Sequence, residues 1–370
     1  MDFEFSAEQV ALRDLAREFL GRESAVPRVR AAIETAPGYD ERLWRQMAEL
    51  GLQGIPVPER YGGQGLGMVE LALLLEEMGR HAYCGPYFPT VVLAGSLIAA
   101  GGSEEQRRRW LSAIASGELR ATVALYEQDP APRLDRLRTR VESGRAVGVK
   151  RFVPHAASAD LILVVGQGGR VLAVERGAAG LTIEPTATMD PTQRDATVRF
   201  ENTPGQALPG GRDAVEAMLR RAAVGASAEM LGAARRSMEM SVEYAKVRKQ
   251  FDQPIGTFQA VKHMCAEMLD EVEHSHAAVY YAAWAQDAEA ADAAMAASVA
   301  KSFVSESARK VCGDAVQVHG GIGFTWEFDL HFFFKRAKHY EPLWGDAEFH
   351  RERVLELALA AETERETVHA

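Results

Sequence analysis

Arg248-Lys-Gln-Phe-Asp-Gln-Pro254-Ile-Gly-Thr-Phe-Gln259 is the stretch of sequence that decides the fold. Apolar residues recur at helical spacing on both sides of it, over residues 215–245 and 261–272. Pro254 interrupts this pattern, because proline lacks a backbone N–H and its ring clashes with the preceding turn. The stretch therefore predicts a sharp corner between two long helices. Arg248 and Lys249 stand at the end of the first helix, where cations complement the helix dipole.

Outward from this corner, the sequence predicts an α+β fold in three parts. Residues 1–118 show the apolar periodicity of helices and form an N-terminal all-α domain. Residues 119–210 contain short β-prone runs separated by turn residues, which predict a small middle antiparallel β domain. Residues 211–370 are helical again with short connections, as in a C-terminal four-helix bundle.

Composition excludes several classes of function. The net charge of −10 argues against non-specific nucleic-acid binding, because phosphate neutralisation needs a basic surface. No Cys-x-x-Cys pair is present and the histidines are irregularly spaced, so we expect neither a disulfide framework nor a metal site. The start of the chain is acidic and no uncharged run is long enough to span a membrane, which predicts a cytoplasmic protein.

A second string lies nearer the C-terminus: Gln317-Val-His-Gly-Gly321, followed by Ile-Gly-Phe324-Thr-Trp-Glu327. Together with Arg-Lys-Gln-Phe and Pro-Ile-Gly-x-Phe-Gln, it resembles the signature of the acyl-CoA dehydrogenases, flavoenzymes that desaturate acyl thioesters. The resemblance covers nearly all of the chain. It implies the three-part fold, FAD as cofactor, an acyl-CoA substrate and an electron-transfer flavoprotein as redox partner.

In relatives, these two strings reach across a subunit interface to the FAD of a neighbouring subunit. A planar guanidinium suits a phosphate group, and adjacent glycines let the backbone come close to a ligand. The resemblance implies the following cofactor-binding residues: Arg248, Gln250, Phe251, Ile255, Phe258, Gln317, Gly320 and Gly321.

The part of the flavin site that a subunit supplies to its own FAD departs from the family pattern. Relatives hold the isoalloxazine ring with a loop like Thr-Glu-Pro-x-x-Gly-Ser-Asp and with a later Trp-Ile-Thr. This chain has Tyr126-Glu-Gln-Asp-Pro130 and Phe152-Val-Pro154 instead. Pro154 offers neither a hydroxyl nor an N–H group, so we expect this half of the site to be weakened.

Both positions at which relatives carry the catalytic glutamate hold another residue. Removing a proton next to a thioester needs a carboxylate within hydrogen-bond reach in a dry pocket. Trp344 occupies the later family position, and Ala222 the earlier one. A displaced base remains an alternative, although a surface charge or a structural ion pair is the simpler interpretation of each candidate. The candidates are Glu341, Asp346 and Glu229.

The residues that the chain would lend to a neighbour are thus present, and those that it needs for itself are altered. This resembles one subunit of the actinobacterial heteromeric (α2β2) acyl-CoA dehydrogenases linked to steroid breakdown, in which the other subunit type supplies the base. We predict that the chain is the partner that lacks the base. Two alternatives stay open: a self-sufficient homotetramer with a displaced carboxylate base, and a flavin-free binding or scaffold protein.

Overall fold

The computed structural model describes residues 4–128 and 131–369, and its contacts divide the chain into two compact units. The helical unit contains residues 1–26, 72–83 and 223–370. The mixed unit contains residues 27–71 and 84–222. Helices α4 (Met68–Arg80) and α8 (Gly211–Val247) contribute residues to both units.

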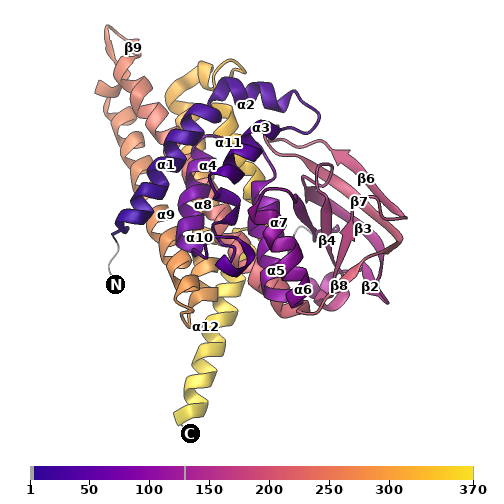
Figure 1. The fold of residues 1–370 in the computed structure, drawn as a ribbon. Coiled ribbons are helices and arrows are strands. Elements are labelled where there is room, and N and C mark those ends of the chain that lie inside the picture. The colour runs from indigo at the N-terminus through magenta and orange to yellow at the C-terminus, as the bar shows by residue number, and fades with distance from the viewer. Residues whose placement is uncertain (1–3, 129–130, 370) are drawn as a thin grey trace. The chain divides into compact units, whose positions relative to one another are not determined.

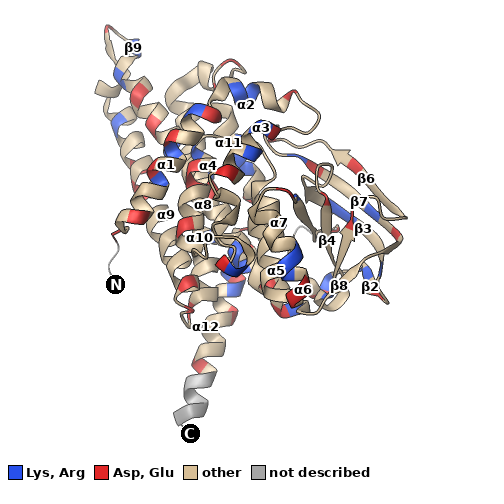
Figure 2. Ribbon diagram, in the orientation of Figure 1, with Lys and Arg blue, Asp and Glu red and all other residues tan. Residues whose placement is uncertain are grey.

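Long helices with short connections build the helical unit (Figure 1). Its first helix begins at a capping box, because the Ser6 hydroxyl accepts the N–H of Gln9 while the Gln9 side chain accepts the N–H of Ser6. Figure 2 shows acidic and basic residues interspersed along these helices, as expected for exposed helix faces. Besides the segments of α4 and α8, the helices are α1 (Ala7–Glu23), α9 (Gln259–Asp287), α10 (Ala293–His319), α11 (Leu330–Tyr340) and α12 (Ala347–His369).

The predicted corner between two long helices is confirmed, and it contains a hairpin that the sequence pattern did not predict. Helix α8 ends at Val247, and the short strands β9 (Lys249–Gln250) and β10 (Gln253–Pro254) pair antiparallel. A 3-10 turn, η7 (Ile255–Thr257), then leads into α9. Phe251 and Asp252 form the tip of the hairpin with positive φ angles of 55° and 64°, the conformation that tight hairpin turns require.

Two glycines let α4 and α8 approach each other closely inside the helical unit. A Cβ atom added to Gly79 would lie 1.9 Å from the carbonyl oxygen of Glu229. A Cβ atom added to Gly232 would lie 1.9 Å from the carbonyl oxygen of Glu76. Since real Cβ atoms do not come so close to an oxygen, any larger residue at either position forces the two backbones apart.

The mixed unit combines short helices with two four-stranded sheets. Its helices are α2 (Val26–Ile33), α3 (Glu41–Glu49), α5 (Ser96–Gly101), α6 (Glu104–Gln106) and α7 (Ser112–Ala115), with π-helical turns at Phe88–Gly95 and Arg107–Leu111. Its strands are β1 (Ala121–Ala124), β2 (Arg140–Glu142), β3 (Arg145–Pro154), β4 (Leu161–Val165), β5 (Val171–Glu175), β6 (Leu181–Thr186), β7 (Asp195–Pro204) and β8 (Gln206–Leu208).

The two sheets have the strand orders β1-β4-β5-β8 and β2-β3-β7-β6. Every pair is antiparallel, as predicted, except β1 with β4, which run parallel. The parallel pairing of β1 with β4 follows from the long connection between them, because the chain forms β2 and β3 in the other sheet before it returns as β4. Buried apolar side chains from both sheets, among them Ile162, Leu172, Val198 and Phe200, form one core cluster.

The strands of both sheets lie between Ala121 and Leu208. The division into domains 1–118, 119–210 and 211–370 remains a prediction, because each contact-defined unit combines segments from more than one of them. Among the described residues, no helix has both the length and the apolarity to cross a membrane.

Candidate functional site

The first sequence string lies on the exposed hairpin at one end of the helical unit (Figure 1). The N–H of Arg248 donates to the carbonyl of Tyr244 at 2.8 Å and thereby closes the last turn of α8. The N–H of Ile255 donates to the carbonyl of Arg248, also at 2.8 Å, which fixes the base of the hairpin. Phe251 is 86% exposed, and its ring meets Phe258 edge to face at 6.1 Å.

The second string follows the end of α10. Gly320 has φ 64° and ψ −141°, a conformation that glycine alone adopts readily. A Cβ atom added to Gly320 or to Gly321 would meet nothing within 4 Å, so the backbone here is open to a ligand. Gln317, one turn earlier, is also exposed.

Aromatic stacking holds the two strings together. The ring of Tyr244, one turn before Arg248, stacks on the imidazole of His319 with centroids 4.5 Å apart. Phe328 packs against the same imidazole at 4.8 Å. Since His319 directly precedes Gly320, both strings lie at the same end of the helical unit.

This end of the helical unit presents apolar as well as polar groups. Val247, Phe251 and Phe324 are 73%, 86% and 82% exposed. Large apolar side chains gathered on a surface mark interaction sites more often than scattered ones do. The guanidinium of Arg248, the carboxamide of Gln317 and the open glycine backbone form a donor set that fits the phosphate and adenine groups of FAD.

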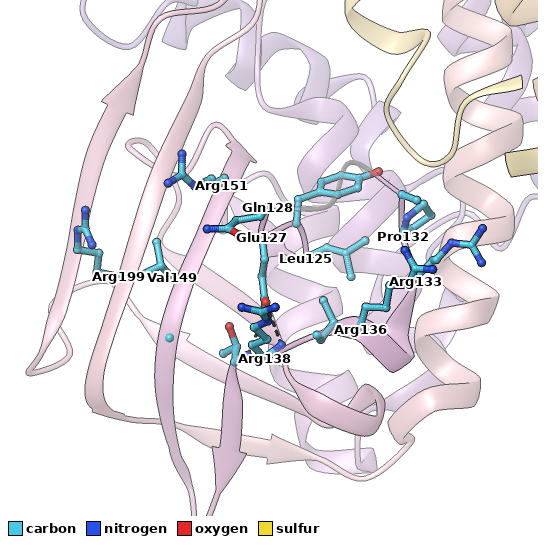
Figure 3. A pocket seen from close by; sticks show the side chains of 15 residues that line it. Leu125, Glu127, Gln128, Pro132, Arg133, Arg136, Arg138, Val149, Arg151 and Arg199 are labelled. Atoms are coloured by element: carbon cyan, nitrogen blue, oxygen red, sulfur yellow. Dashed lines mark hydrogen bonds between the residues drawn. The ribbon is translucent and has the colours of Figure 1, made fainter. Parts of the chain in front are cut away.

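In the mixed unit, Glu127 has a structural role. Its carboxylate accepts hydrogen bonds from Lys150 Nζ at 2.8 Å and from the backbone N–H groups of Arg138 and Thr139 at 2.9 Å each (Figure 3). Burial lowers the pKa of Lys150 to about 8, against the opposing effect of Glu127. Burial raises the pKa of Glu127, but the hydrogen bonds from Lys150 and from the backbone outweigh it and leave that pKa below its ordinary value.

The ring-binding half of a flavin site does not fit the residues of this chain. The Pro154 carbonyl accepts a hydrogen bond from Thr122 Oγ1 at 2.6 Å, and proline has no donor to offer a flavin. Strand β3 bulges between Lys150 and Val153, where Phe152 has a φ of 51°. Of the preceding loop, residues 129 and 130 lie outside the described residues.

Neither family position for the base carries a group that could accept a proton. Ala222 is fully buried in α8. Trp344 is 2% exposed, and its indole N–H is a hydrogen-bond donor only. Trp344 has a φ of 63°, within the turn that connects α11 to α12.

The three candidate carboxylates are each engaged in the structure. Glu341 accepts a hydrogen bond from Arg309 Nε at 3.0 Å and forms an ion pair with Lys338. Asp346 accepts the N–H of Phe349 at 2.8 Å and so caps the start of α12. The third candidate, Glu229, forms a buried ion pair with Arg336 at 2.7 Å. Each carboxylate that the sequence suggested as a displaced base therefore has a structural partner.

The turn that carries Trp344 is held by two buried residues that sequence reasoning did not single out. Lys301 Nζ donates to the carbonyls of Glu341 and Gly345 at 3.0 and 2.8 Å, and burial lowers its pKa to about 7. His350 Nε2 lies 2.9 Å from the carbonyl of Trp344, and burial lowers the pKa of His350 to about 4. Lys301 follows an apolar, alanine-rich helical segment, which is the only sequence signal of its burial.

No group of three or more His, Cys, Asp or Glu residues is arranged to hold a metal ion in the part of the chain that the structure describes. The helical unit thus presents an exposed surface that carries both sequence strings, and neither Ala222 nor Trp344 carries a titratable side chain.

Comparisons with known proteins bear on this arrangement. Two family models match the chain: the one described as acyl-CoA dehydrogenase, N-terminal domain, over residues 6–118, and the one described as acyl-CoA dehydrogenase, C-terminal domain, over residues 210–359. Among curated proteins, the acyl-CoA dehydrogenase IpdE2 of Mycolicibacterium smegmatis is 31% identical over 341 residues, which cover 92% of this chain and 95% of that protein.

Solved structures of similar proteins share the fold of this chain. A variant of the Tcur3481-Tcur3483 steroid ACAD is 33% identical with a TM-score of 0.88, and the match covers 96% of this chain and 99% of that one. The ChsE4-ChsE5 complex of Mycobacterium tuberculosis contains a chain that is 26% identical with a TM-score of 0.87, over 96% of this chain and 98% of that one.

Proposed function

This chain belongs to the acyl-CoA dehydrogenase family of FAD-dependent enzymes, and we propose that it is the subunit without the catalytic base in a heteromeric member of that family. The observation that carries the proposal is a contrast within one chain. The residues that the family resemblance assigns to a neighbour's FAD are all present and most of them are exposed, whereas positions 222 and 344 hold alanine and tryptophan.

In this proposal, the exposed end of the helical unit completes the FAD site of a partner subunit. Bound FAD supplies the two-electron acceptor for α,β-desaturation of an acyl-CoA thioester. Arg248 binds a phosphate oxygen through its guanidinium, and Gln317 with the open backbone at Gly320 and Gly321 provides further donors. The exposed rings of Phe251 and Phe324 become buried against the partner, which contributes apolar association energy.

The partner subunit supplies the carboxylate that removes the α proton. In this chain, Ala222 has no titratable group and Trp344 cannot accept a proton. Glu341 and Asp346 hold an ion-pair network and a helix cap instead of facing a dry pocket as free bases. The proton-transfer step is thus assigned to the partner, and this chain orients the cofactor.

Two of the similar structures support a heteromeric assembly, because the ChsE4-ChsE5 structure is a complex of two named components and the Tcur3481-Tcur3483 protein carries a double name. The Tcur3481-Tcur3483 protein is described as a steroid ACAD. We extend both features to this chain as part of the proposal: a partner subunit of the same fold, and a steroid or fatty acyl-CoA thioester as substrate. An electron-transfer flavoprotein is the proposed electron acceptor.

The visible absorption spectrum tests the proposal. The chain purified alone should contain far less than one flavin per chain, because Pro154 gives the isoalloxazine ring no hydrogen-bond donor. Co-expression and co-purification with an acyl-CoA dehydrogenase subunit that carries the family's glutamate should give a yellow, active complex. Flavin near one per chain in a homo-oligomer with turnover would instead identify a self-sufficient enzyme, and absence of flavin in every preparation would identify a scaffold.

A further inference from the structure

His319 lies between the two sequence strings, yet neither nitrogen of its ring is available to a ligand. Nδ1 lies 2.7 Å from the carbonyl oxygen of Ala315, one turn back in α10. Because a carbonyl can only accept a hydrogen bond, Nδ1 carries the hydrogen of a neutral ring and Nε2 carries the lone pair. Nε2 is buried, and among residues 4–128 and 131–369 it has no hydrogen-bond partner. Any effect of His319 on a bound cofactor must therefore act through its neighbours.

Two aromatic rings pack against this imidazole. The ring of Tyr244 stacks on it with centroids 4.5 Å apart and an angle of 27° between the ring planes. Phe328 contacts it at 4.8 Å and also meets the ring of Tyr244 edge to face at 6.5 Å. Ring pairs at these separations attract one another beyond the area that they bury. Tyr244, His319 and Phe328 therefore form one three-ring cluster.

The three-ring cluster connects the two halves of the cofactor surface. On one side, the carbonyl of Tyr244 accepts the N–H of Arg248 at 2.8 Å, so the stacked ring and the guanidinium come from consecutive turns at the end of α8. On the other side, His319 directly precedes the 3-10 turn Gly320–Phe324, which we call the glycine turn. This turn folds back on His319, because a Cβ atom added to Gly323 would lie 3.1 Å from the Cβ atom of His319.

We propose that His319 is a positioning residue for FAD, because its ring, stacked on Tyr244, holds Arg248 in a fixed place relative to the glycine turn. This inference rests on the proposed function, in which Arg248 and the glycine turn bind the same FAD of a partner subunit. Binding groups have to be held to within about 0.5 Å by packed neighbours. Since residues 246–253 are all exposed, the packing of the hairpin itself contributes little, and the three-ring cluster takes that role.

The imidazole is a neutral ring in the folded chain. Burial lowers the pKa of His319, although the hydrogen bond to Ala315 opposes that shift. At neutral pH the ring therefore stays uncharged, and a hydrogen on Nε2 would have no acceptor among the described residues. A neutral ring that offers no polar atom to a ligand acts through its shape and its stacking. A phenyl ring at this position should therefore do the same.

The FAD dissociation constant of the reconstituted complex, measured from the flavin fluorescence released on dilution, tests the positioning role. Arg248→Ala should weaken FAD binding by about tenfold or more, the worth of a charge-assisted contact. His319→Ala should weaken it by about fivefold or more, since a misplaced guanidinium loses most of that contact. In the Arg248→Ala background, His319→Ala should cost only about twofold or less, because no guanidinium is left to misplace. An equal loss in both backgrounds would overturn the inference.

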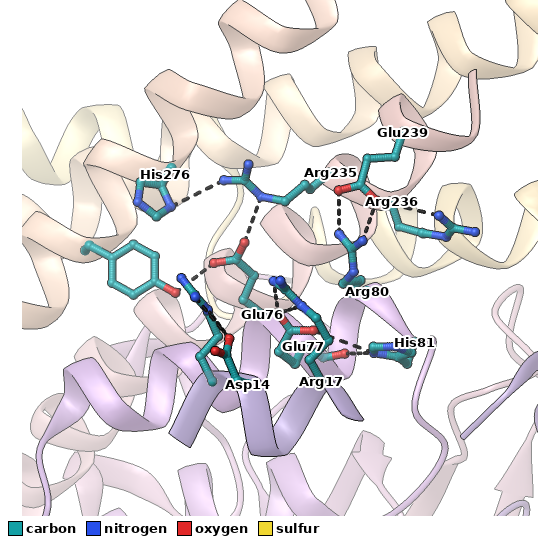
Figure 4. Close-up of polar contacts among 12 residues, drawn as sticks. Asp14, Arg17, Glu76, Glu77, Arg80, His81, Arg235, Arg236, Glu239 and His276 are labelled. Atoms are coloured by element: carbon teal, nitrogen blue, oxygen red, sulfur yellow. Dashed lines mark hydrogen bonds and ion pairs between the residues drawn. The ribbon is translucent and has the colours of Figure 1, made fainter. Parts of the chain in front are cut away.

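His319→Phe separates stacking from hydrogen bonding. A phenyl ring fits between Tyr244 and Phe328 and leaves no unpaired nitrogen, so FAD affinity should stay within about threefold of the parent chain. If this variant loses as much affinity as His319→Ala, the imidazole acts through its nitrogens and the inference is wrong. The control is His276→Ala in α9 (Figure 4), because His276 also packs on a tyrosine, Tyr280, with centroids 4.5 Å apart. Tyr280 belongs to neither string, so this control should keep FAD affinity within about twofold.

Hydrogen exchange of the chain alone separates this inference from the proposed function. The amides of Arg248 and of the glycine turn should lose protection together in His319→Ala and keep it in His319→Phe, because only the phenyl ring preserves the stack. If Arg248→Ala weakens FAD binding while His319→Ala changes neither affinity nor exchange, the proposed function stands and the positioning role fails. If Arg248→Ala leaves FAD affinity unchanged, the proposed cofactor surface fails, and the positioning role fails with it.

Discussion

The guanidinium of Arg336 lies 2.7 Å from the carboxylate of Glu229, and both side chains are buried within the helical unit. Arg336 also donates to the carbonyl of Tyr83 at 2.8 Å, and the hydroxyl of Tyr340 lies 3.3 Å from the same carboxylate. A carboxylate held in this way is stabilised as an anion that anchors α8 to α11, so it is not available as a displaced catalytic base.

Replacing Glu229 by glutamine should therefore destabilise the fold. The substitution leaves the buried charge of Arg336 without its counter-ion, and breaking a buried pair costs about 3–5 kcal/mol. Urea titration of the free energy of unfolding measures the effect. Glu216→Gln is the matched control, because Glu216 pairs with Arg212 at the surface, where such a pair contributes about 1 kcal/mol or less. Equal losses in the two variants would contradict the buried-anchor role.

Gly232→Ala should also destabilise the chain, because the new methyl group would overlap the carbonyl oxygen of Glu76 at the crossing of α4 and α8. The same crossing sets Arg235 Nε 2.9 Å from Glu76 Oε1 (Figure 4). Overpacking typically costs about 1–3 kcal/mol. Gly313→Ala is the control, because its methyl group meets only the Phe334 ring at 3.9 Å, and alanine favours a helix by about 0.5–1 kcal/mol. The melting temperature should fall for Gly232→Ala and rise for Gly313→Ala.

The buried amine of Lys301 should make stability depend on pH. Burial lowers its folded-state pKa to about 7 from the ordinary 10.5, so between these values the unfolded chain binds more protons than the folded one. The free energy of unfolding contributed by this group should thus rise with pH across that window. The nearest acidic groups, Asp346 and Glu341, oppose the shift without cancelling it.

Lys301→Met removes this titration, so the slope of the free energy of unfolding between pH 7 and 10 should decrease. Lys150, whose pKa burial lowers to about 8, titrates in the same window and supplies part of the slope that remains. An unchanged slope in the Lys301 variant would show that the amine is not held in the folded chain as described.

How far the sequence predicted this structure depends on which residues carry the information. The corner at residues 248–259 was predictable, because helical periodicity and Pro254 are local signals. The burial of Lys301 and Arg336 was not, since each charge is satisfied by partners distant in sequence, such as Glu229 for Arg336.

Arg248→Ala should lower the FAD content of the assembled enzyme and leave the fold intact. A charge-assisted contact to phosphate contributes roughly 1.5–3 kcal/mol to binding, whereas an exposed cation at a helix end contributes about 0.3–1 kcal/mol to folding. Flavin absorbance per complex and the melting temperature report the two effects separately. Lys246→Ala, which removes an exposed cation from the same turn, should change neither by much. A lower melting temperature of the Arg248 variant with unchanged flavin content would show that Arg248 stabilises the fold and does not bind FAD.

The assignment of the base to a partner subunit makes the last prediction. Loss of a true general base typically slows turnover by about 10²–10⁴. Glu341→Gln and Asp346→Asn should do far less, because Glu341 is engaged by Arg309 and Lys338, and asparagine replaces aspartate well as a helix cap. Both variants would be assayed in the reconstituted complex, with flavin content measured beside turnover. If one amide alone abolishes turnover while flavin stays bound, that carboxylate is the displaced base, and the chain is a catalytic subunit in its own right.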